Sequence, residues 1–170
     1  ASGWRWAGGE EKRSHRIALR DGRTVELTGR LDRIDAQSGD PTDGRLLLLD
    51  YKARSASDLR SRLKVPGEDV QLPFYGLLLE GRAEQAAYLS FDRAKEGDPG
   101  VERILPQQDF GDLTDAVGAR LQSDLQRIAD GAPLPANGAE SVCKYCEMRG
   151  LCRRDFWKPS GEPGQEGAGG

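Results

Sequence analysis

The centre of the fold is predicted from one short segment, Leu46-Leu47-Leu48-Leu49-Asp50-Tyr51-Lys52. Four consecutive leucines that run into charged residues predict a central strand buried on both faces. Residues i and i+2 of a strand point to the same side, so Asp50 and Lys52 project together where this strand ends. A carboxylate and an ammonium there are costly to desolvate unless they are paired or bind a ligand. A structural salt bridge and a functional site are both open on this evidence alone.

The composition is that of a globular protein. The 170 residues are 36% hydrophobic and 31% charged, which predicts one domain with a substantial core. No apolar run approaches the ~18 to 20 residues of a membrane span, and the N-terminus lacks the apolar core of a signal peptide. We therefore expect a cytoplasmic protein with no membrane partner. Because the only methionine is Met148, we also expect the chain to be a fragment of a longer parent.

A hairpin is expected upstream of the leucine strand. Two alternating segments flank Arg20-Asp21-Gly22-Arg23, and an Asp-Gly turn between such segments predicts a β-hairpin over residues 16–35. Asp32 is expected at the end of its second strand, on the polar face. Since consecutive strands are usually neighbours, this strand end should lie beside the leucine strand.

The downstream sequence alternates between helices and strands. The elements expected there are helices at 58–64, 69–80 and 113–128 and strands at 86–91 and 101–105. The order β-β-β-α-α-β-β-α predicts an α/β fold with a mixed central sheet flanked by helices. We expect this domain to cover residues 1–157 and the Gly- and Pro-rich residues 158–170 to form a disordered tail.

Two carboxylates and one lysine at neighbouring strand ends suit one kind of chemistry. Asp32 and Asp50 could bind a hard divalent cation such as Mg²⁺ or Mn²⁺, with water and a substrate phosphate completing its coordination. Such a metal lowers the pKa of a bound water and stabilises charge that develops on phosphorus. Lys52 could orient that water or the phosphate. The combination predicts hydrolysis of a phosphodiester.

Gln71 and Tyr75 form a further pair on the helix expected at 69–80. They are separated by four residues, so both side chains project from the same helix face. This face could support the metal ligands or contact a DNA backbone. The alternative is an ordinary helix surface with a partly buried tyrosine.

Three motifs in order resemble the RecB-like or AddB-like branch of the PD-(D/E)XK nuclease superfamily. They are Gly29-Arg30-Leu31-Asp32-Arg33-Ile34-Asp35, then Leu49-Asp50-Tyr51-Lys52, and then Gln71-Leu72-Pro73-Phe74-Tyr75. The resemblance implies a restriction-endonuclease-like core with Asp32 and Asp50 as metal ligands and Lys52 as the catalytic lysine. Gln71 and Tyr75 match the motif that follows.

The resemblance also implies a function for the parent protein. It would be a DNA nuclease dependent on Mg²⁺ or Mn²⁺, acting as an exonuclease within a helicase–nuclease system that processes DNA double-strand breaks for repair and recombination. The sequence contains no G-x-x-x-x-G-K-[ST] motif, so a helicase or helicase-like partner would have to come from the same parent chain or complex.

The cysteines form a separate motif, Cys143-x2-Cys146-x5-Cys152. It resembles the C-terminal cysteine segment of iron–sulfur members of the same nuclease branch, in which a fourth cysteine from upstream completes a [4Fe–4S] site. Four thiolates are the usual requirement for such a cluster. Here no cysteine precedes Cys143.

Two interpretations of the missing fourth cysteine remain open. The fourth ligand could lie in a longer parent, or the cluster could be lost, leaving reduced thiols or an adventitious zinc. We expect a cluster in the parent and an absent or incomplete one in this chain.

An alternative to the enzyme is a catalytically silent DNA-binding module that keeps the nuclease fold. Loss of Asp32, Asp50 or Lys52 would indicate such a module, and all three are present. A restriction-type endonuclease would need a specificity element, for which the sequence shows no candidate.

Overall fold

The computed structural model describes residues 3–37, 42, 45–65, 68–91, 102–134 and 143–152. The chain divides into two compact units, residues 1–127 and 128–170, which are described separately. The first contains β1 (Arg5–Ala18), β2 (Thr24–Ala36), β3 (Leu46–Lys52), α1 (Ala56–Leu63), α2 (Gln71–Leu78), β4 (Ala83–Phe91), β5 (Glu102–Pro106) and most of α3 (Phe110–Ala129). The short helix α5 (Arg149–Cys152) belongs to the second.

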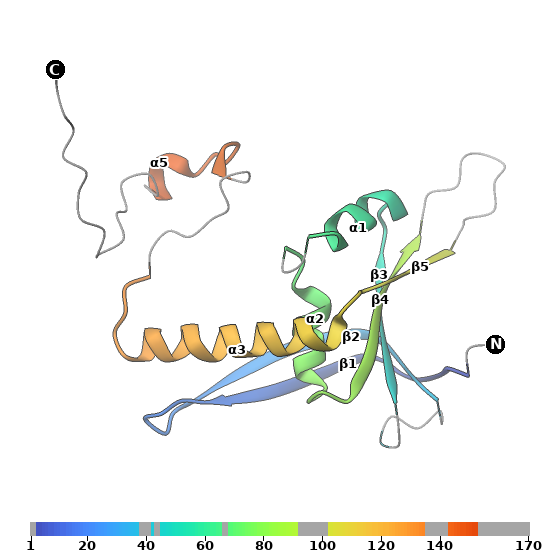
Figure 1. The fold of residues 1–170 in the computed structure, drawn as a ribbon, viewed down its shortest axis with the longest axis horizontal. Helices are drawn as coiled ribbons and strands as arrows, with labels where there is room; N and C mark the ends of the chain where they lie inside the picture. The colour runs from blue at the N-terminus through green and yellow to red at the C-terminus, as the bar shows by residue number, and fades with distance from the viewer. Residues whose placement is uncertain are drawn as a thin grey trace. The chain divides into compact units, whose positions relative to one another are not determined.

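The five strands form one mixed sheet in the order β1-β2-β3-β4-β5, with β3 at its centre (Figure 1). Leu46, Leu48 and Leu49 are buried and Leu47 is half-buried, so the prediction of a buried central strand is confirmed. β3 pairs antiparallel with β2 and parallel with β4. A parallel pair needs a crossover connection, which α1 and α2 supply. The predicted α/β fold with a mixed, helix-flanked sheet is therefore confirmed.

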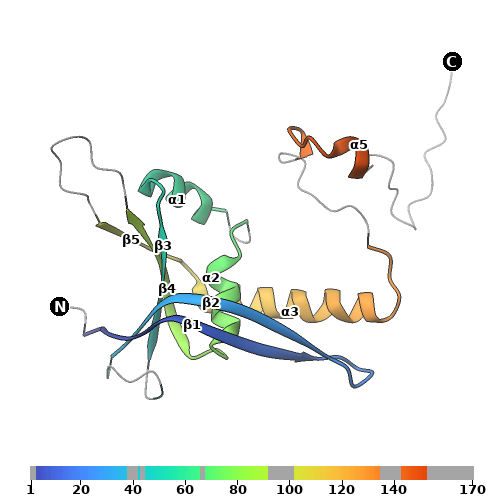
Figure 2. The ribbon, with the colours of Figure 1, turned by 180° about the vertical axis from the view of Figure 1, so that it is seen from behind.

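The β1–β2 hairpin is much longer than the sequence predicted. It turns at Asp21-Gly22 as expected, but β1 begins at Arg5 rather than near residue 16. The alternation signal is missing from the early part of β1 because most of its side chains there are exposed or half-exposed, and apolar residues do not mark one face. Only residues 33–36 of β2 pair with β3, so the rest of the hairpin forms a ribbon beyond the sheet (Figure 2).

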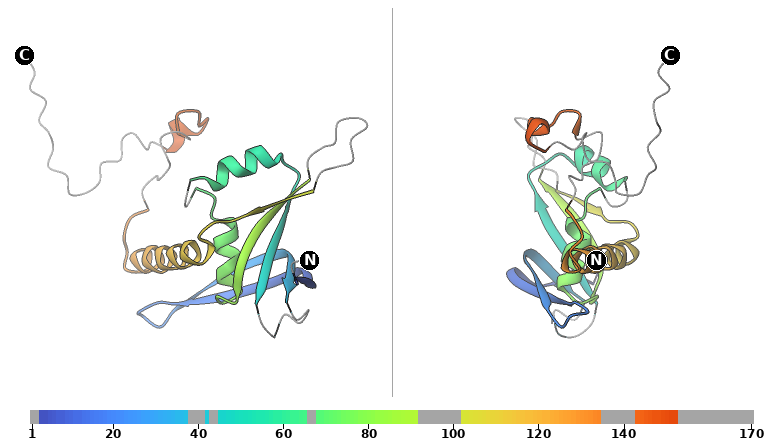
Figure 3. Two further views of the ribbon diagram at one scale, coloured as in Figure 1. Left: turned by 45° about the vertical axis from the view of Figure 1, so that its right-hand side comes forward. Right: turned by 90° about the vertical axis from the view of Figure 1, so that its left-hand side faces the viewer.

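Helix α2 packs between the sheet and α3 (Figure 3). On one side, an added Cβ at Gly29 of β2 would lie 2.5 Å from Leu78 of α2. On the other, an added Cβ at Gly76 of α2 would lie 2.7 Å from Thr114 of α3. These close approaches hold the later part of α2 against β2 and α3, while its first residue, Gln71, contacts the end of β3. α3 in turn contacts the hairpin end, where Gln122 Nε2 donates to the carbonyl of Ala18 at 2.8 Å.

The helices begin and end close to their predicted bounds, with one informative difference. Ser55 caps α1 by accepting from the Asp58 amide at 3.1 Å. α2 begins at Gln71, two residues later than predicted, and Val70 rather than Asp69 is its N-cap residue. The Asp69 carboxylate is instead drawn toward other partners, which are described below. The tail predicted over 158–170 lies outside the described residues.

Among the residues that the structure describes, no helix is both long and apolar enough to cross a membrane.

Candidate active site

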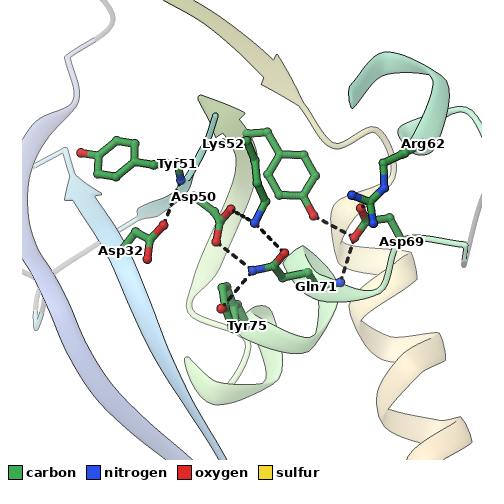
Figure 4. A network of polar contacts seen from close by, with 9 residues as sticks. Asp32, Asp50, Tyr51, Lys52, Arg62, Asp69, Gln71 and Tyr75 are labelled. Atoms are coloured by element: carbon green, nitrogen blue, oxygen red, sulfur yellow. Dashed lines mark hydrogen bonds and ion pairs between the residues drawn. The ribbon is translucent and has the colours of Figure 1, made fainter. Parts of the chain in front are cut away.

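The strongest polar cluster of the first unit lies where β3 ends against the start of α2 (Figure 4). Asp50 and Lys52 project from the same side of β3, and Lys52 Nζ lies 2.6 Å from Asp50 Oδ2. The Asp50 side chain is 3% exposed and that of Lys52 is 21% exposed. The two charges therefore form a nearly buried ion pair, in the arrangement expected from their i, i+2 spacing.

Gln71, the first residue of α2, connects both charges of this pair. Its amide Nε2 donates to Asp50 Oδ1 at 2.9 Å, and its Oε1 accepts from Lys52 Nζ at 2.8 Å. The same Nε2 donates to the hydroxyl oxygen of Tyr75 at 3.1 Å, one helical turn further along α2. The structure thus brings Gln71 and Tyr75 together with the β3 residues, whereas the spacing alone had also left a plain helix surface open.

Asp32 lies beside the cluster, but not at a strand end as predicted. β2 continues to Ala36, and Asp32 lies within it, immediately before the first residue that pairs with β3. Its Oδ2 accepts a 2.9 Å hydrogen bond from the backbone amide of Tyr51. The strand continues because residues 33–36 are still needed to pair with the leucine strand. Asp35, three residues on, is instead bound by Arg33 through two hydrogen bonds of 2.7 and 2.9 Å.

The electrostatics of the site favour binding of a cation. Burial raises the pKa of Asp50, Lys52 opposes this rise, and the negative charges of Asp32 and Asp69 add to it. Asp50 Oδ2 is buried and, apart from the ion pair with Lys52, has no hydrogen-bond partner. Burial and the neighbouring carboxylates both disfavour the ionised form of Asp50. A cation bound beside this carboxylate would stabilise the ionised form.

Three residues of this polar network were not predicted as site residues from the sequence: Arg62, Asp69 and Tyr88. Tyr88 of β4 is fully buried, and its hydroxyl donates to Asp69 Oδ1 at 2.7 Å. Asp69 also accepts a 3.2 Å hydrogen bond from the backbone amide of Gln71 and forms an ion pair with Arg62 of α1 at 3.3 Å. A tyrosine within the apolar strand 86–91 was the available signal, because a buried phenol requires a partner for its hydroxyl.

The structure does not bring the three cysteines together. They are free thiols, with Cys143 half-buried and Cys146 and Cys152 exposed. In the described part of the chain, no three His, Cys, Asp or Glu side chains form a group that could hold a metal ion. Neither an iron–sulfur cluster nor a three-ligand zinc site is therefore formed by the described residues.

No curated protein sequence matches the chain. A solved structure, "Crystal structure of SSO0001", is similar with 17% sequence identity and a TM-score of 0.40. The match covers 85% of this chain and 59% of that one, so the chain spans about three fifths of that protein's length.

The family comparison is more informative. The model of the PD-(D/E)XK nuclease superfamily matches residues 1–153, which include the whole sheet, the polar cluster and the cysteine segment. The mixed five-stranded sheet with flanking helices agrees with the restriction-endonuclease-like core of that superfamily. The chain belongs to the PD-(D/E)XK nuclease superfamily.

Proposed function

We propose that this chain is a divalent-metal-dependent deoxyribonuclease domain that hydrolyses phosphodiester bonds. The observation that carries the proposal is the cluster of Asp50, Lys52 and Gln71, held by contacts of 2.6 to 2.9 Å, with Asp32 on the adjoining strand. Membership of a nuclease superfamily supports the reaction type. The choice of DNA as substrate rests on the resemblance to the RecB-like branch.

The residues present fit a hard divalent cation such as Mg²⁺ or Mn²⁺. Asp32 and Asp50 provide two carboxylates, which is the number that Mg²⁺ commonly takes from a protein when water and phosphate complete its coordination. The Asp50 side chain is almost fully buried, with the ammonium of Lys52 as the partner of Oδ2 at 2.6 Å, and a cation would further offset the desolvation of this carboxylate. When bound, the cation would supply Lewis-acid stabilisation of the phosphate and an acidified water.

The chain's own residues have distinct parts in the proposed reaction. In hydrolysis, the oxygen of a water forms a new bond to phosphorus while one phosphorus–oxygen ester bond breaks, leaving a phosphate monoester and an alcohol. Lys52 carries the positive charge that attracts a phosphate oxygen as negative charge develops on it. Gln71 holds Lys52 and Asp50 in a fixed relative orientation, and Tyr75 anchors the Gln71 amide.

We further propose that the domain acts as an exonuclease within a helicase–nuclease system for double-strand-break processing. The support is the order of the three motifs over residues 29–75, which resembles the RecB-like branch. Labelled linear DNA and covalently closed circular DNA of the same sequence distinguish the modes of cutting. An exonuclease degrades the linear form and spares the circle, whereas cleavage of both at equal rates would contradict the proposal.

The described cysteines do not fit a [4Fe–4S] cluster. Three thiolates are present where four are needed, and they form no common ligand group. We therefore assign no step of the reaction to an iron–sulfur cluster.

The decisive experiment compares the parent protein with Asp50→Asn and Lys52→Ala on labelled single- and double-stranded linear DNA, with Mg²⁺ and with Mn²⁺. We expect each substitution to reduce the cleavage rate by about a hundredfold or more, because Asp50→Asn removes a proposed metal-binding carboxylate and Lys52→Ala removes the positive charge that attracts the phosphate oxygen. Lys12→Ala is the matched control, since Lys12 lies exposed on the outer strand β1. The proposed nuclease activity would be wrong if the unsubstituted protein bound DNA without cutting it. The assignment of Asp50 and Lys52 would be wrong if their variants cut at the rate of the unsubstituted protein.

A further inference from the structure

The aromatic ring of Tyr88 lies next to the ammonium group of Lys52. The distance from Lys52 Nζ to the ring centroid is 5.2 Å, within the range of a cation–π contact. Tyr88 lies on β4 directly across from Asp50 in the parallel β3–β4 pair, and it is fully buried. The proposed active site therefore rests on a ring supplied by the neighbouring strand.

The orientation of this ring is held by Asp69. The Tyr88 hydroxyl donates to Asp69 Oδ1 at 2.7 Å, and the same oxygen accepts from the backbone amide of Gln71 at 3.2 Å. Asp69 Oδ2 lies 3.3 Å from Arg62 Nε, and the Asp69 side chain is only 6% exposed. One buried carboxylate thus joins a residue of α1, the first residue of α2 and the middle of β4 (Figure 4).

Lys52 needs such support because its side chain is intrinsically mobile. An ammonium on a flexible four-carbon stem has many rotamers, so its position depends on what surrounds it. Asp50 and Gln71 contact it from two sides, and both contacts would persist in several orientations of the stem. The Tyr88 ring lies on a third side, where it further restricts the positions open to the ammonium.

We propose that Tyr88 and Asp69 are positioning residues, which hold the Lys52 ammonium and the Gln71 amide in the geometry that the reaction requires. Tyr88 acts on Lys52 through its ring face. Asp69 acts on Tyr88 through the phenol and on Gln71 through the start of α2. The inference rests on the proposed nuclease function, although the contacts themselves do not depend on it.

A first test measures the position of Lys52 without reference to activity. The ε-methylene next to Nζ should show an upfield ring-current shift in a ¹H–¹³C spectrum, assigned with Lys52→Ala. We expect Tyr88→Phe to retain this shift, because the ring remains, and Tyr88→Leu to abolish it. A Lys52 resonance unchanged by Tyr88→Leu would overturn the inference whether or not the protein cuts DNA.

A second test is kinetic. Tyr88→Leu should lower kcat about tenfold, as expected for loss of one partly desolvated cation–π contact, with little change in KM for DNA. Asp69→Asn should lower kcat in the same way, because the amide replaces the ionised acceptor of the phenol. In a Lys52→Ala background, Tyr88→Leu should cause no further loss of the residual rate.

Phe110→Leu is the matched control, since Phe110 is also a buried aromatic residue, lies on α3 and is not part of the network. If Tyr88→Leu lowers kcat no more than Phe110→Leu does, Tyr88 is only a core residue. If Tyr88→Leu does not fold, Asp69→Asn decides, and it must then show the kcat loss. An inactive parent that still shows the ring-current shift would reject the proposed function while retaining the positioning contact.

Discussion

Gln71 Nε2 donates a 2.9 Å hydrogen bond to Asp50 Oδ1, across 21 residues of sequence. This bond joins the first residue of α2 to the end of the central strand. Because the Oε1 of the same amide accepts from Lys52, the orientation of the Gln71 side chain is set by a negative group on one side and a positive group on the other. Both Asp50 and Lys52 are thereby held by one side chain.

Replacing Gln71 by leucine should impair catalysis with little loss of structure. Gln71→Leu keeps the side-chain volume similar but removes hydrogen bonds to two charged groups, each worth about 1.5–3 kcal/mol. We expect kcat/KM for linear DNA to fall by about tenfold to a hundredfold. Gln85→Leu, at an exposed position of β4, is the control and should cut at the parental rate. Equal rates for the two variants would remove Gln71 from the site.

Metal affinity should depend on Asp50. Titration calorimetry with Mn²⁺ in the absence of DNA should detect binding to the parent and at least a tenfold weaker affinity in Asp50→Asn, since a neutral amide is a poorer ligand than a carboxylate. Asp115→Asn, exposed on α3, should bind as the parent does. Binding that survives Asp50→Asn unchanged would place the cation elsewhere.

The Tyr88 hydroxyl should stay protonated in the folded protein at high pH. Burial, and then the hydrogen bond and negative charge of Asp69, raise the pKa of Tyr88 far above the ordinary tyrosine value of 10.0. The native protein binds this proton more tightly than the unfolded chain, so the stability from Tyr88 is complete below about pH 10 and is lost as pH rises further. Tyr88→Phe should therefore weaken the fall in unfolding free energy above pH 10, measured by urea denaturation.

Absorbance at 295 nm provides a direct check of the same titration. Tyr88→Phe should leave the titration curve of the native protein unchanged below the onset of alkaline unfolding. It should remove one of the four tyrosines from the curve recorded in denaturant. A native curve that loses amplitude in Tyr88→Phe would show that the phenol ionises in the folded state.

The contact between α2 and α3 should tolerate no side chain at Gly76. An added Cβ would lie 2.7 Å from Thr114 Oγ1 and 2.8 Å from Phe110 Cζ, and Thr114 is itself held by a hydrogen bond to the Phe110 carbonyl. We expect Gly76→Ala to reduce the free energy of unfolding by about 1–3 kcal/mol, because overpacking must displace one of the helices.

Gly111→Ala is the control for this substitution. No atom lies within 4 Å of the added Cβ, and the residue is in the first turn of α3. Alanine at such a position should be neutral or stabilise by up to about 1 kcal/mol. If Gly76→Ala and Gly111→Ala have the same unfolding midpoint in urea, the close helix contact is wrong.

Much of the fold could be predicted from local patterns. The four leucines ending at Asp50 predicted the central strand, because a strand covered on both sides needs apolar residues at every position. The Asp21-Gly22 turn predicted the hairpin, because a glycine in a turn between alternating segments can supply the positive φ that Gly22 adopts here. The first half of β1 was missed because it forms the edge strand of the sheet, where most side chains are exposed or half-exposed and apolar residues do not alternate.

The candidate site could also be predicted only in part from the sequence. The spacing of Asp50 with Lys52 and of Gln71 with Tyr75 placed each pair on one side of its element, because strands and helices have fixed periods. How the two pairs meet depends on where α2 crosses the sheet, and no local pattern specifies a crossing. Asp69 shows the limit most clearly: it was expected to cap a helix, but its carboxylate accepts from Tyr88 and pairs with Arg62.

The central strand, the order of the motifs and the chemical types of the site residues could be predicted from the sequence, since they follow from short-range periodicity and composition. The folded structure was needed to show that Asp32 lies within β2, that Gln71 joins Asp50 to Lys52, and that the Tyr88 ring lies beside the ammonium. These contacts join residues about 20 to 40 positions apart. They are determined by the packing of whole elements, and packing is a property of the assembled core.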